Sequence, residues 1–148
     1  MIRKILISVV AALGLVLGLT VTAPPAQASD SLGADTCSAG GKTSAMYVWV
    51  SHYTSGGVAI SRVDHIKFYG FYGGQGMDVT ASIITDSGVQ WKLGGDGAIW
   101  TSYAYEGNTW VYDVYPNKST QSQNHPYVLG KAGQNNDGYP VCSIVVRI

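Results

Sequence analysis

The sequence is poor in charge and in cysteine. Charged residues occupy 12% of its 148 positions, nine Lys and Arg residues balance nine Asp and Glu residues, and there are two cysteines. A nucleic-acid binder needs a basic surface that displaces counterions from phosphates, so the zero net charge argues against a nucleic-acid partner. Two cysteines are too few for a disulfide-dense mini-protein or for a zinc module built on cysteine ligands.

Helical periodicity is also absent from residues 30 to 148. Apolar residues do not recur every three or four positions, and glycine interrupts the chain every few residues. Short runs rich in Val, Ile, Tyr, Trp and Thr end at Gly, Asn, Asp or Pro, which is typical of strands and turns. About eight short strands in about 120 residues predict an all-β fold, an antiparallel β-sandwich with a barrel as the alternative topology. The predicted strands are Ala45–His52, Val58–Val63, His65–Tyr69, Met77–Thr85, Val89–Leu93, Ala98–Tyr105, Thr109–Tyr115 and Val141–Ile148, with a short one at Tyr127–Leu129.

The segment that ends at Ala28 has the pattern of a secretory signal peptide. Arg3 and Lys4 precede an apolar run over Ile5–Val21, and an A-x-A sequence that ends at Ala28 places small residues where signal peptidase reads them. An uncleaved membrane anchor is the alternative, since the run is at the short edge of what spans a bilayer. Cleavage is favoured because two prolines precede the small-residue site. We therefore predict a secreted protein, extracellular or periplasmic and bacterial in type, whose mature chain begins near Ser29.

The mature chain, residues 29–148, is expected to form a single domain. Removing the leader leaves seven basic and nine acidic residues, a net charge of −2, and keeps the two Phe, four Trp and ten Tyr. A domain of this size buries roughly two-thirds of its extended-chain surface, enough for a core of its own. Cys37 and Cys142 lie near its two ends, and in an oxidising compartment we expect them to form one disulfide. We expect no membrane association after the leader is removed, and the oligomeric state is left open.

A first hairpin is predicted around a three-residue loop at Asp86-Ser87-Gly88, whose glycine suits the left-handed position that such loops require. Pairing Thr85 with Val89 would place Ile83 opposite Trp91. The apolar residues of both strands then share one face, which is what a half-buried hairpin should show.

A second hairpin is predicted around a turn at Glu106-Gly107-Asn108. Its aromatic-rich face is expected to be core, and its other face, which carries a charged residue, to be wetter. The core face would hold Ile99, Thr101, Tyr103, Tyr105, Trp110, Tyr112 and Val114, and the wetter face Trp100, Ser102, Ala104, Val111, Asp113 and Tyr115.

Catalytic and metal-binding patterns are weak. Glu106 is the sole Glu, so a glycosidase pair of carboxylates is poorly supported, and the G-x-S-x-G motif of many serine hydrolases is missing. The three histidines have no close spacing that suits zinc. Calcium loops at 94–97 or 135–138 are better explained as tight turns. We therefore expect the protein to bind no cofactor and no metal and to have no catalytic activity.

The aromatic surplus favours a binding role. Planar aromatic side chains cover the apolar faces of sugars, and the hydroxyl- and amide-rich loops at Lys118–Asn124 and Gln134–Asp137 can bond to sugar hydroxyls. The sequence thus predicts a secreted binding module for a carbohydrate or a cell-surface partner. An inhibitor or toxin-like effector that acts on a protein is the main alternative, and a small hydrolase is less favoured. The candidate ligand-binding residues are Trp100 and Tyr115 on the wetter face of the second hairpin, and Phe71 and Tyr72 in the glycine-rich segment 70–76.

Overall fold

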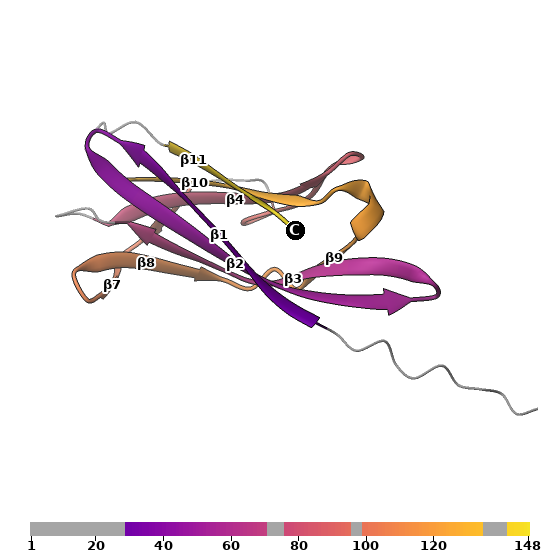
Figure 1. Ribbon diagram of the computed structural model, residues 1–148. Helices are drawn as coiled ribbons and strands as arrows, with labels where there is room; N and C mark the ends of the chain where they lie inside the picture. Colours follow the sequence, from indigo (N-terminus) through magenta and orange to yellow (C-terminus); the bar gives the residue numbers. More distant parts are fainter. Residues whose placement is uncertain (1–28, 71–75, 96–98, 135–141) are drawn as a thin grey trace, which may run out of the picture.

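The computed structural model describes residues 29–70, 76–95, 99–134 and 142–148 (Figure 1). These residues form eleven β-strands and a single turn of 3₁₀ helix, Ser122–Asn124, so the predicted all-β class is confirmed. The strands form two antiparallel sheets. The proposed signal peptide lies outside the described residues.

The larger sheet contains six strands. Its order is β1-β2-β3-β8-β7, and β9 pairs with β3 beyond the end of β8. The strand bounds are β1 Ser29–Ala39, β2 Lys42–Ser55, β3 Val58–Gly70, β7 Ala104–Glu106, β8 Thr109–Val114 and β9 Lys118–Gln121. The sequence analysis missed β1, and it assigned β9 to a loop. The strands predicted at Val58–Val63 and His65–Tyr69 form the single strand β3. Asp64 is the extra residue of a bulge between the pairs Val50–Val63 and Trp49–His65.

The smaller sheet contains five strands in the order β11-β10-β4-β5, and β6 also pairs with β4. The bounds are β4 Met77–Thr85, β5 Gly88–Lys92, β6 Trp100–Ser102, β10 Tyr127–Gln134 and β11 Cys142–Arg147. The bounds of β4 agree with the predicted strand. The short strand expected at Tyr127–Leu129 is longer than predicted, because all of β10 pairs with β4.

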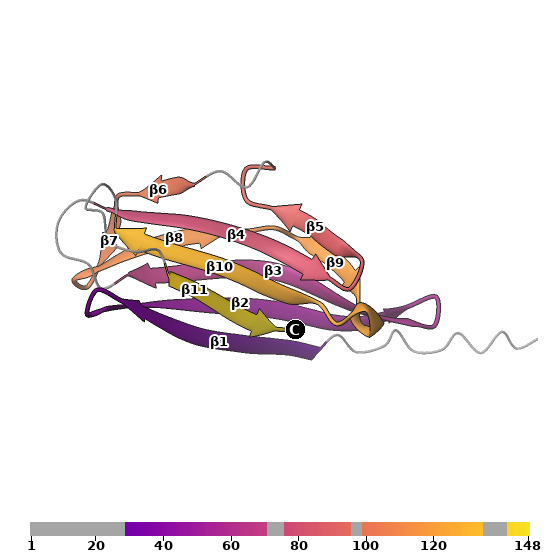
Figure 2. The ribbon, with the colours of Figure 1, turned by 90° about the horizontal axis from the view of Figure 1, so that it is seen from above.

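Side chains from both sheets form one core cluster, and Figures 1 and 2 show the sheets one over the other. The core is mainly aliphatic, and Phe68 is the one aromatic side chain among the fully buried residues that the structure describes. Gly130 of β10 makes room for it, since a Cβ there would come within 2.4 Å of Met46 Sδ and 2.7 Å of the Phe68 ring. The predicted disulfide is also confirmed. Cys37 of β1 is bonded to Cys142 of β11, which ties an edge strand of one sheet to an edge strand of the other.

The first hairpin is confirmed in its facing and corrected in its turn. Ile83 lies opposite Trp91 as predicted, but Thr85 pairs with Gly88, not with Val89. The turn is therefore two residues long, and Gly88 adopts a φ of +100° within the strand. A bulge then restores the expected alternation, so that the buried side chains of β4 face the core.

The second hairpin is only partly as predicted. Tyr105 pairs with Trp110 across a two-residue turn, and Trp110, Tyr112 and Val114 face the core as expected. The predicted strand at Ala98–Tyr105 is wrong, because its described part divides at Tyr103 into β6 of one sheet and β7 of the other. Ile99, Tyr103 and Tyr105, predicted to be core, are 63%, 69% and 52% exposed, whereas Val111 and Ser102, predicted to be on the wetter face, are buried.

Candidate functional site

The outer face of the six-stranded sheet gathers most of the described aromatic residues that point away from the core. Strand β2 shows how this arises, because its successive side chains alternate between faces. Met46 and Val48 are fully buried in the core, whereas Tyr47 and Trp49 between and after them are half-buried on the other side. Strand β3 and the end of β8 supply the neighbouring rings. We call Tyr47, Trp49, His65, Tyr69 and Tyr115 the aromatic face.

Three rings of this face form a stack that crosses the strands. The His65 ring lies between Trp49 and Tyr115, with a centroid distance of 4.4 Å on each side and interplanar angles of 15° and 6°. This spacing is close to the distance between neighbouring strands, so the rings stand upright on the sheet and not flat upon it. Both faces of His65 are thus covered. Tyr115, at the end of the stack, packs one ring face on His65 and is 65% exposed.

An open pocket of about 530 Å³ lies beside this stack. Its volume is within the range of roughly 300–1,000 Å³ typical of small-molecule sites. Ala45 is buried at the pocket, and its small side chain leaves the space that the surrounding larger side chains enclose. The pocket is lined by Leu32, Ala45, Tyr47, Trp49, Tyr69 and Thr109.

Charged side chains border the aromatic face on the β8 side. The Lys67 ammonium lies 3.2 Å from Glu106 and 3.8 Å from Asp113, and 5.2 Å from the centre of the Tyr69 ring. The hydrogen bond to Glu106 raises the pKa of Lys67, with the charge of Asp113 adding to it and burial opposing it. His65 Nε2 is 2.6 Å from the Asp113 carboxylate, and this contact holds the stacked ring in place.

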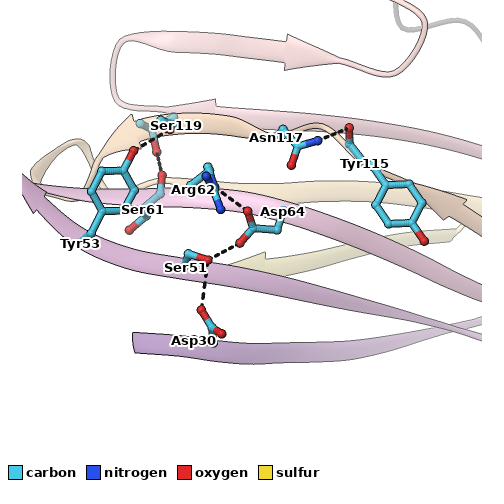
Figure 3. Close-up of polar contacts among 10 residues, drawn as sticks. Asp30, Ser51, Tyr53, Ser61, Arg62, Asp64, Tyr115, Asn117 and Ser119 are labelled. Carbon is cyan, nitrogen blue, oxygen red and sulfur yellow. Dashed lines mark hydrogen bonds and ion pairs between the residues drawn. The ribbon is translucent and has the colours of Figure 1, made fainter. Parts of the chain in front are cut away.

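A chain of polar contacts borders the face at its other end, from β1 to β3 (Figure 3). The Ser51 hydroxyl lies 3.1 Å from the Asp30 carboxylate and 2.5 Å from that of Asp64, which also accepts a bond from Arg62 Nε at 2.5 Å. The bulge in β3 is what brings Asp64 to this position. A single hydroxyl hydrogen serves one acceptor at a time, so Ser51 donates to only one of the two carboxylates at once.

Of the predicted ligand-binding residues, Trp100 and Tyr115 lie on different sheets. Tyr115 belongs to the aromatic face. Trp100 is exposed at 46%, but it lies on β6 of the other sheet, where its ring covers Gly94 so closely that a Cβ there would come within 2.6 Å of the indole nitrogen. Phe71 and Tyr72 lie outside the described residues.

The sequence analysis missed four of the five residues of the aromatic face. Tyr47, Trp49, His65 and Tyr69 were inside predicted strands, but no facing was derived for them. The signal was available in β2, where aliphatic residues at 46, 48 and 50 alternate with aromatic residues at 47 and 49. Such alternation indicates two different apolar surfaces, one for the core and one for something else.

Histidine and serine contacts do not combine into a hydrolytic triad among the described residues. Histidine–carboxylate contacts occur at His65 and at His125, whose Nδ1 lies 2.6 Å from Asp86 on the surface. Serine–histidine contacts occur instead at His52, where Ser31 is 2.9 Å from Nε2 and Ser61 is 3.2 Å from Nδ1. Both nitrogens of His52 are therefore occupied by hydroxyls, which leaves neither for the carboxylate that orients a catalytic histidine.

No family model matches the chain, and neither a curated protein nor a solved structure matches it. Within the ranges that the structure describes, no three His, Cys, Asp or Glu side chains are grouped so that they could hold a metal ion. In the same ranges no helix has the length and apolar character needed to cross a bilayer. The side chains of the aromatic face therefore carry the functional argument.

Proposed function

We propose that this protein is a secreted, non-enzymatic binding module that holds a carbohydrate on the outer face of its six-stranded sheet. The observation that carries this proposal is the aromatic face with its open pocket, in which Tyr47, Trp49 and Tyr69 surround the space above Ala45. Side chains of this kind match the apolar C–H faces of sugar rings, and aromatic residues dominate the binding energy of many recognition sites.

The fold itself does not require these aromatic residues. The fully buried core is built from Val, Ile, Met and a single Phe, and leaving a large apolar side chain partly in water forgoes roughly 2 kcal/mol of burial free energy. Several such side chains on one face, close to a pocket, are typical of an interaction surface.

Hydrogen-bonding groups surround the aromatic centre as a sugar ligand requires. Thr109 lines the pocket, Glu106 and Asp113 lie on one side, and Asp30 and Asp64 lie on the other. Sugar hydroxyls donate readily to carboxylates, and such bonds are stronger than those between neutral groups. Specificity would come from these few polar groups, and stacking would supply most of the affinity.

Export and the sandwich arrangement are part of the same proposal. Cys37 of β1 is disulfide-bonded to Cys142, as suits an oxidising compartment. An extracellular or periplasmic location of a bacterial type would place the aromatic face where glycans are found. The core cluster draws side chains from both sheets, which supports a β-sandwich as the architecture.

A glycan array with the mature protein tests the proposal. We expect binding to at least one glycan class, and we expect Trp49→Ala to weaken it about tenfold or more while the protein stays folded. Tyr127→Ala is the matched control, because Tyr127 is an equally partly buried aromatic residue in β10 of the other sheet. An array without any bound glycan, or equal binding by Trp49→Ala and the wild type, would remove the proposed function.

A further inference from the structure

We infer that the ligand is an uncharged oligosaccharide of several sugar units that reaches from the pocket to the exposed ring of Tyr115. This inference rests on the proposed function and adds the length and the charge of the ligand. It draws on three observations. The aromatic face offers two separate places for stacking, the cations that border it are in ion pairs, and carboxylates that accept hydrogen bonds border it as well.

The face has two separate contact points for a sugar ring. His65 cannot stack on a ligand, because Trp49 and Tyr115 cover both sides of its ring at 4.4 Å. Stacking is therefore left to the pocket, which Trp49 lines, and to the exposed ring of Tyr115, which does not line the pocket. The Trp49 and Tyr115 rings lie on opposite sides of His65, each 4.4 Å from it, and the separation between them is wider than one sugar ring. A ligand that uses both contact points must contain more than one unit.

The charges of the face exclude an anionic ligand. Among the described residues, the cationic side chains that border the aromatic face are Arg62 and Lys67. Both are in ion pairs, Arg62 with Asp64 at 2.5 Å and Lys67 with Glu106 at 3.2 Å. An anionic sugar would have to break these pairs and approach the carboxylates that form them. Like charges brought together in this way cost several kcal/mol in typical interfaces.

The hydrogen-bonding capacity of the face favours a donor-rich ligand. Asp30 and Asp64 share the single hydrogen of Ser51, and the Asp113 carboxylate lies beside His65 at the foot of the ring stack. Carboxylates only accept hydrogen bonds, so the groups that complement them are donors. A neutral oligosaccharide supplies hydroxyl donors at regular intervals along its length.

Isothermal titration of the mature protein with cello-, chito- and malto-oligosaccharides, each from one to six units, tests the inference. We expect affinity in one series to rise about tenfold or more between two and six units. Tyr115→Ala should remove this rise, whereas Trp49→Ala should weaken binding of the two-unit and the six-unit sugar alike. A heparin hexasaccharide and hexagalacturonate serve as anionic probes of matched length, and both should bind more weakly than the neutral hexasaccharide.

The outcomes separate this inference from the function on which it rests. Tighter binding of an anionic probe, or equal affinity for one unit and six units, overturns the inference while Trp49-dependent sugar binding survives. Affinity for the neutral hexasaccharide that falls steeply with added salt also overturns it, because an uncharged ligand releases no counterions. Failure of all three neutral series to bind overturns the inference, and a blank glycan array overturns the proposed function as well.

Discussion

The two sheets present different outer faces although their inner faces are alike. Both inner faces carry buried aliphatic side chains that meet in one core. The outer face of the six-stranded sheet holds the aromatic face and its pocket, with Asp30, Asp64, Glu106 and Asp113 against Arg62 and Lys67. The outer face of the five-stranded sheet has Tyr127 as its aromatic residue among those described, with hydroxyls and aliphatic side chains around it. Its outer-facing side chains include Asp78, Thr80, Ser82, Ile84, Lys92, Tyr127, Leu129, Lys131, Ser143, Val145 and Arg147.

This difference separates the demands of folding from those of function. A sheet needs one apolar face to bury, and the five-stranded sheet has an ordinary polar second face. The six-stranded sheet carries large apolar side chains on both faces, and only those of the inner face belong to the core cluster. The aromatic side chains around the pocket above Ala45 lie on the outer face and are not part of the core. The comparison predicts that stability depends on the inner faces and ligand binding on one outer face.

The largest expected effect concerns the disulfide that links the two sheets. Replacing Cys37 and Cys142 together by Ala should lower the free energy of unfolding by roughly 2–5 kcal/mol, because the disulfide closes a sequence separation of 105 residues between the sheets. Urea titration of the wild type and the double variant measures this difference. Equal unfolding midpoints would show that the link between β1 and β11 contributes nothing.

A second set of variants compares inner and outer positions. Trp91→Ala and Trp110→Ala should each lower the free energy of unfolding by roughly 2–4 kcal/mol, since both side chains pack against the core. Lys92→Ala, next to Trp91 but on the outer face, should stay within about 0.5 kcal/mol. Thermal and urea unfolding of all three variants measures the contrast, and equal small effects would mean that the facing of these strands has no energetic consequence.

A third variant blocks the pocket without removing an aromatic ring. Ala45→Leu should fill the space above Ala45 and weaken carbohydrate binding about tenfold or more, while the added side chain is accommodated in the open pocket. Ser82→Leu makes the same kind of change on the outer face of the five-stranded sheet and should leave binding unchanged. Titration with the best ligand from the array decides the matter. Loss of binding in both variants, or in neither, would contradict the contrast between the two outer faces.

The smallest effect concerns the charges beside the aromatic face. Glu106→Gln should lower the free energy of unfolding at neutral pH by less than about 1 kcal/mol, because the pair with Lys67 is at the surface. The hydrogen bond to Glu106 raises the pKa of Lys67 above 10.5, so its stabilisation is complete below pH 10.5 and is lost as the pH rises through the pKa in the folded state. Urea unfolding at neutral and at alkaline pH should therefore show the wild type and the variant converging above pH 10.5. A difference that grows with pH would contradict the ion pair.

Local pattern was sufficient for much of the fold. The run Met77–Thr85 alternates apolar and polar residues and ends at a turn sequence, and it forms the strand with those bounds. The pair Ile83–Trp91 follows from the same alternation even though the turn is one residue shorter than predicted, because the bulge compensates for it. The Cys37–Cys142 bond could be predicted because the two cysteines of a chain expected to be exported have one way to pair.

Other features could not be derived from local pattern. Segment 99–105 looks like one strand, yet it changes sheets at Tyr103, and this depends on which partners β4 and β8 already have. Strand β1 contains few β-branched or large residues, and it is a strand because the edge of β2 offers hydrogen bonds along its whole length. Tyr115 was predicted at the site from the facing of the second hairpin, whereas Trp100 was assigned to the same surface although it lies on the other sheet.

Alternation and turn residues act over a few positions, and they identify the all-β class and the core-facing residues of β4 and β5, while the two cysteines identify the disulfide. Which side of β2 is buried depends on the packing of the folded chain, because residues 45–50 are apolar on both faces and the choice depends on what packs against each. Met46 and Val48 meet Phe68 and the five-stranded sheet, where aliphatic side chains fill the core. Tyr47 and Trp49 are left on the side where His65 and Tyr115 continue the row of rings, which is why the candidate site became visible only in the folded chain.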